Sequence, residues 1–368
     1  MAFEHDRAWI DHMRPQFTIP ALMMDKEKAK VAIDKVFRDM AGAMAAGMAF
    51  VGTRTGLFRA MQGKGPMTLE GVVRESGLEP RYVEEWLKGM VSAGYLEYDP
   101  AARTYLLPEE YAYFLASDGS DHFVGGMWEM VPVLMRVAPK VAEAFAKGGG
   151  VQFEEFGPDC IGALDLINRG QYEQRFADYW LKSLPEVVER LRAGGSALDF
   201  GCGTGRVCIA LAKAFPRAAI MGFDVHAESI RRAGEAAGAA GVRIDFRTQE
   251  PSGESFDLVT ICDCIHDLAQ PVATLREVRA LLKPDGTLFI VEPKAADRLE
   301  DNRHSVATTF YGFSLFHCMT QSLARGGPGL GTCLGPAGTE KLVREAGFTR
   351  FRVLDIKSQT NLFYAANP

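Results

Sequence analysis

The stretch Leu198-Asp199-Phe200-Gly201-Cys202-Gly203-Thr204-Gly205 decides the fold of this 368-residue chain. It joins a short apolar run to a segment, beginning near Val207, whose apolar residues recur at helical spacing. Glycines at alternate positions allow a tight turn and let the backbone come close to a ligand. In an α/β domain, such a turn lies at the carboxyl end of a strand, where small-molecule cofactors bind. We therefore expect a cofactor-binding turn here.

Short apolar strands alternate with helices from Ser196 onward. This alternation is typical of an α/β domain with a parallel sheet, and two further strands in the tail could close the sheet. The predicted strands are 197–200, 219–223, 242–246, 256–261, 287–291, 351–356 and 361–365, and the helices between them include 228–239, 272–282 and 339–346.

The spacing of the glycines separates two classes of cofactor. A dinucleotide fingerprint has the form G-x-G-x-x-G, but Arg206 stands where its last glycine would be. Asp224 ends the second predicted strand, 25 residues after Asp199, where a carboxylate can accept hydrogen bonds from both ribose hydroxyls. The alternative role for Asp224 is to cap the helix that follows it.

These features, together with Leu282-Lys283-Pro284-Asp285-Gly286 before the fifth strand, resemble class I S-adenosylmethionine-dependent methyltransferases over residues 196–368. The resemblance implies a Rossmann-like domain with a seven-stranded mixed sheet. It also implies S-adenosyl-L-methionine as cofactor and S-adenosyl-L-homocysteine as product. The expected cofactor-binding residues are Asp199, Gly201, Gly203, Gly205, Asp224, Gln249 and Asp263.

A histidine follows the fourth predicted strand, in Cys262-Asp263-Cys264-Ile265-His266-Asp267. Its ordinary pKa of about 6.5 suits a general base that takes a proton from a hydroxyl near neutral pH. The segment is similar to the I/L-H-D stretch of small-molecule O-methyltransferases, whose histidine is the catalytic base, although Leu268 replaces their usual tryptophan. The resemblance makes His266 the candidate base; a purely structural histidine is the alternative.

Aromatic side chains cluster after the fifth predicted strand and could hold a flat acceptor. Ordinary core packing is the alternative. The candidate acceptor-binding residues are Phe310, Tyr311, Phe313 and His317, with Phe316 beside them. An oxygen acceptor, a phenol or other hydroxyl, fits a histidine base, whereas methylation of nitrogen, carbon or sulfur would leave His266 dispensable.

The amino-terminal part reads as helix, turn, helix and hairpin. Thr68 can cap a helix that ends at Ser76 before Gly77, and 81–91 has one apolar face. Asp99-Pro100 then separates two short strands, so the pattern predicts a winged helix. The segment from Met67 to Gly94 contains three basic and five acidic residues, and this excess of negative charge disfavours DNA binding.

A winged helix ahead of a methyltransferase domain resembles plant and bacterial small-molecule O-methyltransferases, in which the front domain dimerises and covers the active site. The resemblance implies a homodimer. We expect a helical dimerisation domain over 1–120, a helical connector and active-site cover over 121–192, and the methyltransferase domain over 193–368. A transcriptional regulator that senses S-adenosylmethionine is the second hypothesis.

The composition is that of a globular protein, with 47% hydrophobic and 24% charged residues. The net charge of −6 gives no attraction to nucleic acid or anionic lipid, and small molecules are the expected partners. The first residues, 1–15, lack the pattern of a signal peptide, and no transmembrane helix is expected. Seven cysteines without an export signal predict reduced thiols and a cytoplasmic protein. We expect no metal site, because Cys262 and Cys264 would point to opposite faces of a strand.

Overall fold

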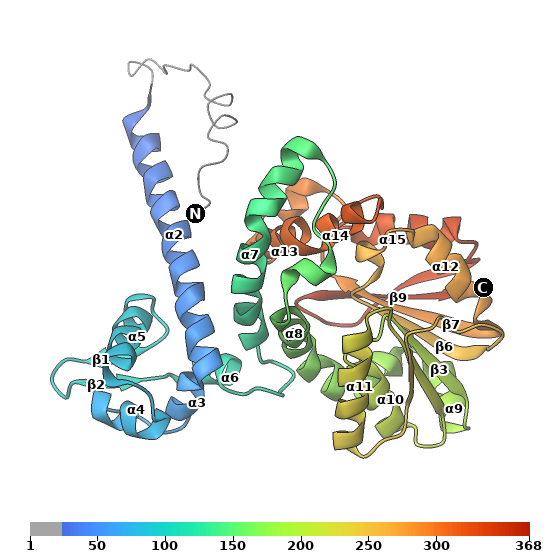
Figure 1. Ribbon diagram of the computed structural model, residues 1–368, viewed down its shortest axis with the longest axis horizontal. Helices are drawn as coiled ribbons and strands as arrows, with labels where there is room; N and C mark the ends of the chain where they lie inside the picture. The colour runs from blue at the N-terminus through green and yellow to red at the C-terminus, as the bar shows by residue number, and fades with distance from the viewer. Residues whose placement is uncertain (1–23) are drawn as a thin grey trace, which may run out of the picture. The chain divides into compact units, whose positions relative to one another are not determined.

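The computed structural model describes residues 24–368, and the segment in which we expect no signal peptide lies outside them. The backbone forms two compact units, divided between Ala45 and Ala46. The long helix α2 (Lys26–Thr55) contributes to both units. Figure 1 shows the order of the elements along the chain. Among the described residues, no helix is long and apolar enough to cross a bilayer.

The first unit consists, in its described part, of the amino-terminal portion of α2. Large apolar side chains on this portion are exposed rather than packed: Val31, Ile33, Val36, Phe37, Met40 and Met44. Exposed apolar side chains that gather on one element mark an interaction surface. This stretch of α2 is therefore an exposed apolar surface.

The second unit begins with the predicted winged helix. Thr68 Oγ1 accepts a hydrogen bond from the Gly71 amide at the start of α4, and Gly77 ends that helix in the left-handed conformation. Trp86 and Phe58 pack edge to face in its core, with ring centroids 5.2 Å apart. The prediction is confirmed in its elements: α3 (Leu57–Met61), α4 (Leu69–Ser76), α5 (Pro80–Ser92), β1 (Glu97–Asp99), β2 (Thr104–Leu106) and α6 (Glu109–Leu115).

The connector is helical, as predicted. Its apolar residues pack around Met130, Val137 and Phe156, all fully buried. The chain leaves this core through a π-helical turn, η3, in which Phe176 and Trp180 are also fully buried against the sheet. The elements are α7 (Gly125–Lys147), η2 (Phe153–Phe156), α8 (Asp159–Arg175), η3 (Phe176–Trp180), η4 (Leu181–Ser183) and α9 (Pro185–Arg192).

A seven-stranded mixed sheet forms the carboxyl-terminal part, in the order β5-β4-β3-β6-β7-β9-β8. β9 runs antiparallel to both of its neighbours, and the first five strands are parallel. The fold class is the predicted one. The strands are β3 (Ser196–Phe200), β4 (Ala219–Phe223), β5 (Asp245–Arg247), β6 (Phe256–Cys262), β7 (Leu282–Pro293), β8 (Arg350–Leu354) and β9 (Asn361–Asn367).

Helices cover both faces of this sheet (Figure 1). The side chains of β3 alternate, so Ala197 packs into one layer and Leu198 into the other. The first layer holds α9, α10 (Arg206–Ala214) and α11 (Ala227–Ala240), and the second holds α12 (Pro271–Ala280) and α15 (Gly335–Glu345). The carboxyl ends of β3, β4 and β6 meet at one edge.

Several predicted boundaries were wrong, among them the start of the helix predicted from Thr339, which begins at Gly335. The third strand starts at Asp245 rather than Val242, and the helix predicted to reach Leu282 ends at Ala280. The strand predicted from Thr287 begins at Leu282, because Leu282 pairs with Phe256 across an irregular register that Gly286 permits. A Cβ at Gly286 would lie 2.8 Å from the Phe256 carbonyl oxygen. The aromatic segment after β7 forms α13 (Ser305–Phe313), the π-helical turn η7 (Ser314–Cys318) and α14 (Met319–Ala324).

Candidate active site at the carboxyl edge of the sheet

The glycine-rich turn between β3 and α10 has a backbone that only glycine adopts readily. Gly201, Gly203 and Gly205 have φ angles of 77°, 51° and 76°. A Cβ at Gly201 would lie 2.8 Å from Cys264 Sγ, and one at Gly205 would lie 2.6 Å from the Phe246 ring. The turn therefore depends on its glycines for both conformation and space, as expected of a cradle for a ligand.

Asp224 holds this turn from the end of β4. One carboxylate oxygen accepts a hydrogen bond from the Gly203 amide at 2.9 Å, and the other accepts one from the His226 amide at 2.8 Å. Burial raises the pKa of Asp224, although both amide bonds oppose the change. Each carboxylate oxygen has a second lone pair, so Asp224 can still receive two hydroxyl groups. His226, rather than Asp224, caps α11.

Asp199 is buried at the end of β3. Its Oδ1 accepts a hydrogen bond from Thr260 Oγ1 at 2.6 Å, and Cys208 Sγ lies 3.8 Å from Oδ2. Burial, reinforced by the charge of Asp224, raises the pKa of Asp199 to about 7. The carboxylates of buried Asp199 and half-buried Asp224 therefore lie close together at the glycine-rich turn.

Asp263 lies at the end of β6 and has a φ angle of 50°, a left-handed conformation. Aspartate adopts this conformation more readily than most residues other than glycine, and such positions are common at functional sites. Its carboxylate accepts a hydrogen bond from the Tyr172 hydroxyl of α8. Burial raises the pKa of Asp263 to about 6. Gln249, the other expected contact, is exposed after β5.

Helix α8 contacts the glycine-rich turn through a network of hydrogen bonds and ion pairs that the sequence did not predict. Asp165 accepts hydrogen bonds from Thr204 Oγ1 at 2.5 Å and from Arg206 Nε at 2.6 Å. Arg206 Nη1 also donates to Glu173 at 2.8 Å. Burial alone raises the pKa of Asp165, but Arg206, Thr204 and Arg169 lower it overall. The available signal was Arg206 itself, the residue that replaces a glycine of the dinucleotide fingerprint.

His266 forms a buried pair with Glu292 of β7. The distance from His266 Nδ1 to Glu292 Oε2 is 2.5 Å, and the other oxygen of Glu292 accepts from the Ile265 amide at 3.0 Å. Burial by itself lowers the pKa of His266, but Glu292 and then Asp267 raise it, and the result is well above the ordinary value. Glu292 contacts only Nδ1, and Nε2 of His266 lies 3.3 Å from Asp267 Oδ1.

The predicted acceptor-binding residues divide into two groups. His317 is buried, 4.8 Å from the Phe156 ring, and Phe313 packs against the same connector core. Phe310 is buried, whereas Tyr311 is exposed. Phe153 links these residues to the turn, because its ring lies 4.9 Å from His226 and 6.2 Å from His317. Phe153 was not predicted.

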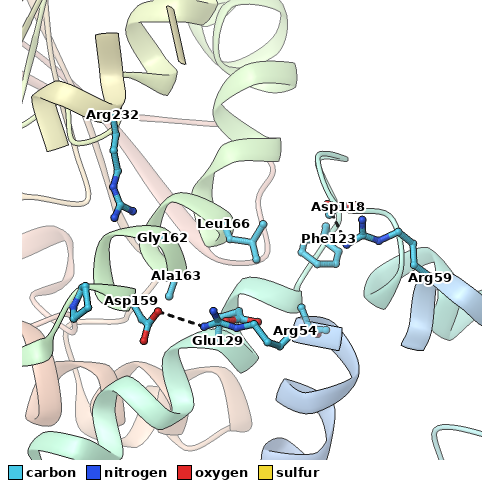
Figure 2. Close-up of a pocket in the computed structure, with 12 residues that line it drawn as sticks. Arg54, Arg59, Asp118, Phe123, Glu129, Asp159, Gly162, Ala163, Leu166 and Arg232 are labelled. Atoms are coloured by element: carbon cyan, nitrogen blue, oxygen red, sulfur yellow. Dashed lines mark ion pairs between the residues drawn. The ribbon is translucent and has the colours of Figure 1, made fainter. Parts of the chain in front are cut away.

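A charged cavity of about 400 Å³ lies on the other side of α8 (Figure 2). Arg54 from α2 pairs with Glu129 of α7 at 2.7 Å and lies 3.7 Å from Asp159 of α8. Burial raises the pKa of Glu129, and Arg54 opposes this. Three arginines and three acids line the cavity, together with Thr53, Phe123, Pro158, Gly162, Ala163 and Leu166. None of the predicted site residues lines it.

Two family profiles match the chain. Residues 198–288 match the family described as a methyltransferase domain, and residues 43–117 match the Rv2258c-like winged HTH domain.

Curated relatives match parts of the chain. The uncharacterized 37.1 kDa protein in transposon TN4556 of Streptomyces fradiae is 30% identical over 45% of this chain and 48% of its own length. The ubiquinone biosynthesis O-methyltransferase of Actinobacillus pleuropneumoniae serotype 7 is 34% identical over 26% of this chain and 44% of its own length. The chain thus spans about half the length of the curated relatives it matches.

A solved structure shares the fold over nearly the whole chain. Human N-acetylserotonin methyltransferase in complex with SAM aligns with a TM-score of 0.64 and 21% identity. The alignment covers 91% of this chain and 97% of the human chain.

Proposed function

We propose that this chain, which carries a methyltransferase domain behind a winged-helix domain, transfers a methyl group from S-adenosylmethionine to an oxygen of a small molecule. The observation that carries the proposal is the buried His266–Glu292 pair beside the glycine-rich turn. A base and a cofactor cradle at one edge of a sheet are the two parts that transfer to a hydroxyl needs. The named O-methyltransferase relative supports an oxygen acceptor.

The residues at the turn fit this cofactor. The glycine backbone leaves room for close approach, and the carboxylate of Asp224 offers acceptors to paired ribose hydroxyls. Asp199 and Asp263 supply negative charge for a cationic ligand. Gln249 is exposed in the turn after β5, and this turn would have to move toward the cofactor for Gln249 to contact the adenine. When bound, S-adenosylmethionine supplies a methyl group that is already activated for transfer. The protein therefore has to position the acceptor next to this methyl group and exclude water from the site.

We propose His266 as the general base. Nδ1–H donates to Glu292, which fixes the tautomer and leaves Nε2 as the nitrogen that accepts the acceptor's proton. The carboxylate then stabilises the imidazolium that forms. Phe313 and His317, from the segment after β7, are the proposed contacts of a flat acceptor, and Phe310 supports them from the buried side. Tyr311 would contact the acceptor only at the exposed rim.

The test compares two substitutions of the same kind. His266→Asn removes the base, whereas His304→Asn changes the cap of α13 to another good capping residue. With labelled S-adenosylmethionine and a panel of phenols, we expect His266→Asn to lower the rate by roughly 100-fold or more and His304→Asn to leave it unchanged. Equal rates in the wild type and His266→Asn would refute the base assignment.

We propose that the protein is a homodimer joined through α2. The exposed apolar side chains of its amino-terminal portion, such as Phe37 and Met40, form a surface that a second copy would cover. Sedimentation of the wild type should give a dimer, and Phe37→Asp should shift it to a monomer. Leu299→Asp, at an exposed position in the carboxyl-terminal part of the chain, is the control. A monomeric wild type would contradict the proposal.

The regulator hypothesis has less support. On α5, Arg81 pairs with Glu85 and Lys88 pairs with Glu84, at 2.6 Å each, so the basic groups of this helix are already neutralised. We propose that the winged helix contributes to dimerisation rather than to binding of nucleic acid. The seven cysteines are all free, which fits a reducing compartment, and we propose a cytoplasmic protein whose partner is a small molecule.

A further inference from the structure

Three potential metal ligands of different chemistry meet beside the proposed base. The ligand atoms of His266, Asp267 and Cys318 all lie within 4.8 Å of one another. His266 and Asp267 belong to the short helical turn η5 (Ile265–Asp267), and Cys318 ends the π-helical turn η7. His266 and Cys318 are buried, and Asp267 is half-buried. The fold thus brings together residues that are 51 positions apart in the sequence.

The orientation of the His266 ring leaves Nε2 as the nitrogen that can bind a ligand. Glu292 occupies Nδ1 and so leaves Nε2 facing Asp267 Oδ1, 3.3 Å away. Metal-bound histidines usually donate their other nitrogen's proton to a carboxylate in this manner, which fixes the ring and makes the ligating nitrogen more basic. Glu292 therefore provides the supporting contact that a metal-binding histidine needs.

Asp267 gives an independent indication. Its Oδ1 atom is buried and accepts no hydrogen bond from any residue in 24–368. When His266 is protonated, its Nε2–H pairs with this oxygen at 3.3 Å. When His266 is neutral with its proton on Nδ1, the oxygen has no donor, which is unfavourable, and a cation at this position would satisfy it. The unpartnered oxygen is the same atom that faces His266 Nε2.

We propose that His266 Nε2, the Asp267 carboxylate and the Cys318 thiolate bind a thiophilic divalent cation of the Zn²⁺ class. A nitrogen, oxygen and sulfur donor set suits Zn²⁺ or Co²⁺, whereas Mg²⁺ and Ca²⁺ require oxygen ligands. Three protein ligands leave a fourth tetrahedral position for water or another ligand. On binding, the Cys318 thiol and a protonated His266 Nε2 each lose a proton to solvent, and the thiolate sulfur and the imidazole nitrogen then form bonds to the metal.

The site has a consequence for the proposed reaction. A cation on Nε2 occupies the lone pair that would accept the proton of the acceptor, so metal binding and base catalysis exclude each other. The binding itself does not depend on the proposed function, because it rests on the three ligands alone. We expected no metal site from the sequence, because Cys262 and Cys264 would point to opposite faces of a strand. Cys318 comes close to His266 only through the fold.

The test is a titration of the full chain, without a histidine tag, with Co²⁺. We expect one Co²⁺ to bind with a thiolate-to-cobalt charge-transfer band in the near ultraviolet, and Zn²⁺ to abolish that band. Cys318→Ser should remove the band. Cys160→Ser is the matched control, because Cys160 is also buried and contacts His317 but is not one of the three ligands.

Asp267→Asn provides a second variant, which keeps the size of the side chain at a half-buried position. We expect it to keep the charge-transfer band and to weaken Co²⁺ binding at least tenfold. A wild type that shows no band at stoichiometric Co²⁺ would overturn the proposal. So would loss of the band in Cys160→Ser, or unchanged Co²⁺ affinity in Asp267→Asn.

Discussion

His266 Nδ1 lies 2.5 Å from Glu292 Oε2, and both side chains are almost completely buried. Glu292 is on β7 and His266 follows β6, so two adjacent parallel strands carry the two partners to the same edge of the sheet. Burial of an ion pair is favourable only when the remaining polar atoms are satisfied, and the Ile265 amide satisfies the second oxygen of Glu292. The pair is therefore built into the sheet rather than placed on a loop.

This pair predicts how the reaction depends on pH. His266 accepts a proton only when neutral, and its pKa is raised well above the ordinary value, so the rate should rise as the pH rises above neutrality. Glu292→Gln removes the charge that raises this pKa. We expect the midpoint of the kcat/KM profile to shift to lower pH by about one unit or more, with a lower maximal rate. Glu186→Gln on α9 is the control, and an unmoved midpoint in Glu292→Gln would contradict the account.

Asp224 should be required for cofactor binding. Its carboxylate accepts a hydrogen bond from the Gly203 amide, and in the proposed site it would also accept hydrogen bonds from the ribose hydroxyls. Asp224→Ala should raise the dissociation constant of S-adenosylmethionine by tenfold or more, because hydrogen bonds to charged groups contribute about 1.5–3 kcal/mol each. Calorimetry measures this directly. Wild-type affinity in Asp224→Ala would remove the residue from the site.

Asp199 should lower the free energy of unfolding of the cofactor-free protein at neutral pH. Its pKa of about 7 in the folded protein exceeds the value of about 3.9 in an unfolded chain, so folding favours the protonated form. The stability from this group is present at acidic pH and is lost as the pH rises through about 7. Asp199→Asn should therefore stabilise the apo protein at pH 8 by roughly 1 kcal/mol while weakening cofactor binding.

The matched control for Asp199 is Asp257, a buried aspartate at the opposite end of the sheet. Burial raises the pKa of Asp257, but Lys283 and the Ser196 amide lower it overall. The contribution of Asp257 to the stability of the fold is therefore present at neutral pH and is lost as the pH falls. Asp257→Asn should lower the Tm at pH 8, and a Tm change of the same sign in both variants would contradict the electrostatic argument.

The contact between α8 and the glycine-rich turn predicts a positioning role for Asp165. Asp165→Asn weakens the hydrogen bonds to Thr204 and Arg206, so the glycine-rich turn becomes less ordered in the free protein. Part of the binding free energy of the cofactor is then used to order the turn. We expect S-adenosylmethionine to dissociate faster and its affinity to fall about tenfold. Arg169→Gln removes a different partner of Asp165 and spares the turn, so its affinity should be nearly unchanged. Stopped-flow release of the cofactor distinguishes the two.

The sequence predicted features whose cause is local. Thr68 and Gly77 mark the ends of α4 through caps that involve only nearby atoms, and Gly201 to Gly205 form a turn that their own backbone requires. The elements of the sheet followed from the alternation of apolar runs. The start of β7 could not be predicted, because Leu282 joins the strand through its pairing with Phe256.

The missed parts of the site depend on contacts between distant segments. Asp165 meets Thr204 from 39 positions away, and Glu292 meets His266 from 26. No periodicity or spacing encodes such contacts, because each arises from how α8 and β7 pack against the turn and the sheet. The predicted residues His266, Asp224 and His317 were identifiable only by chemical type and by their places after strands or aromatic runs.

Transfer of a labelled methyl group from S-adenosylmethionine into a fractionated extract, by the wild-type protein, tests the central claim most directly. The account predicts that label enters a low-molecular-mass compound as an O-methyl group and that macromolecular fractions stay unlabelled. Binding of S-adenosylmethionine without label in any fraction would contradict it and would favour a sensor of the cofactor.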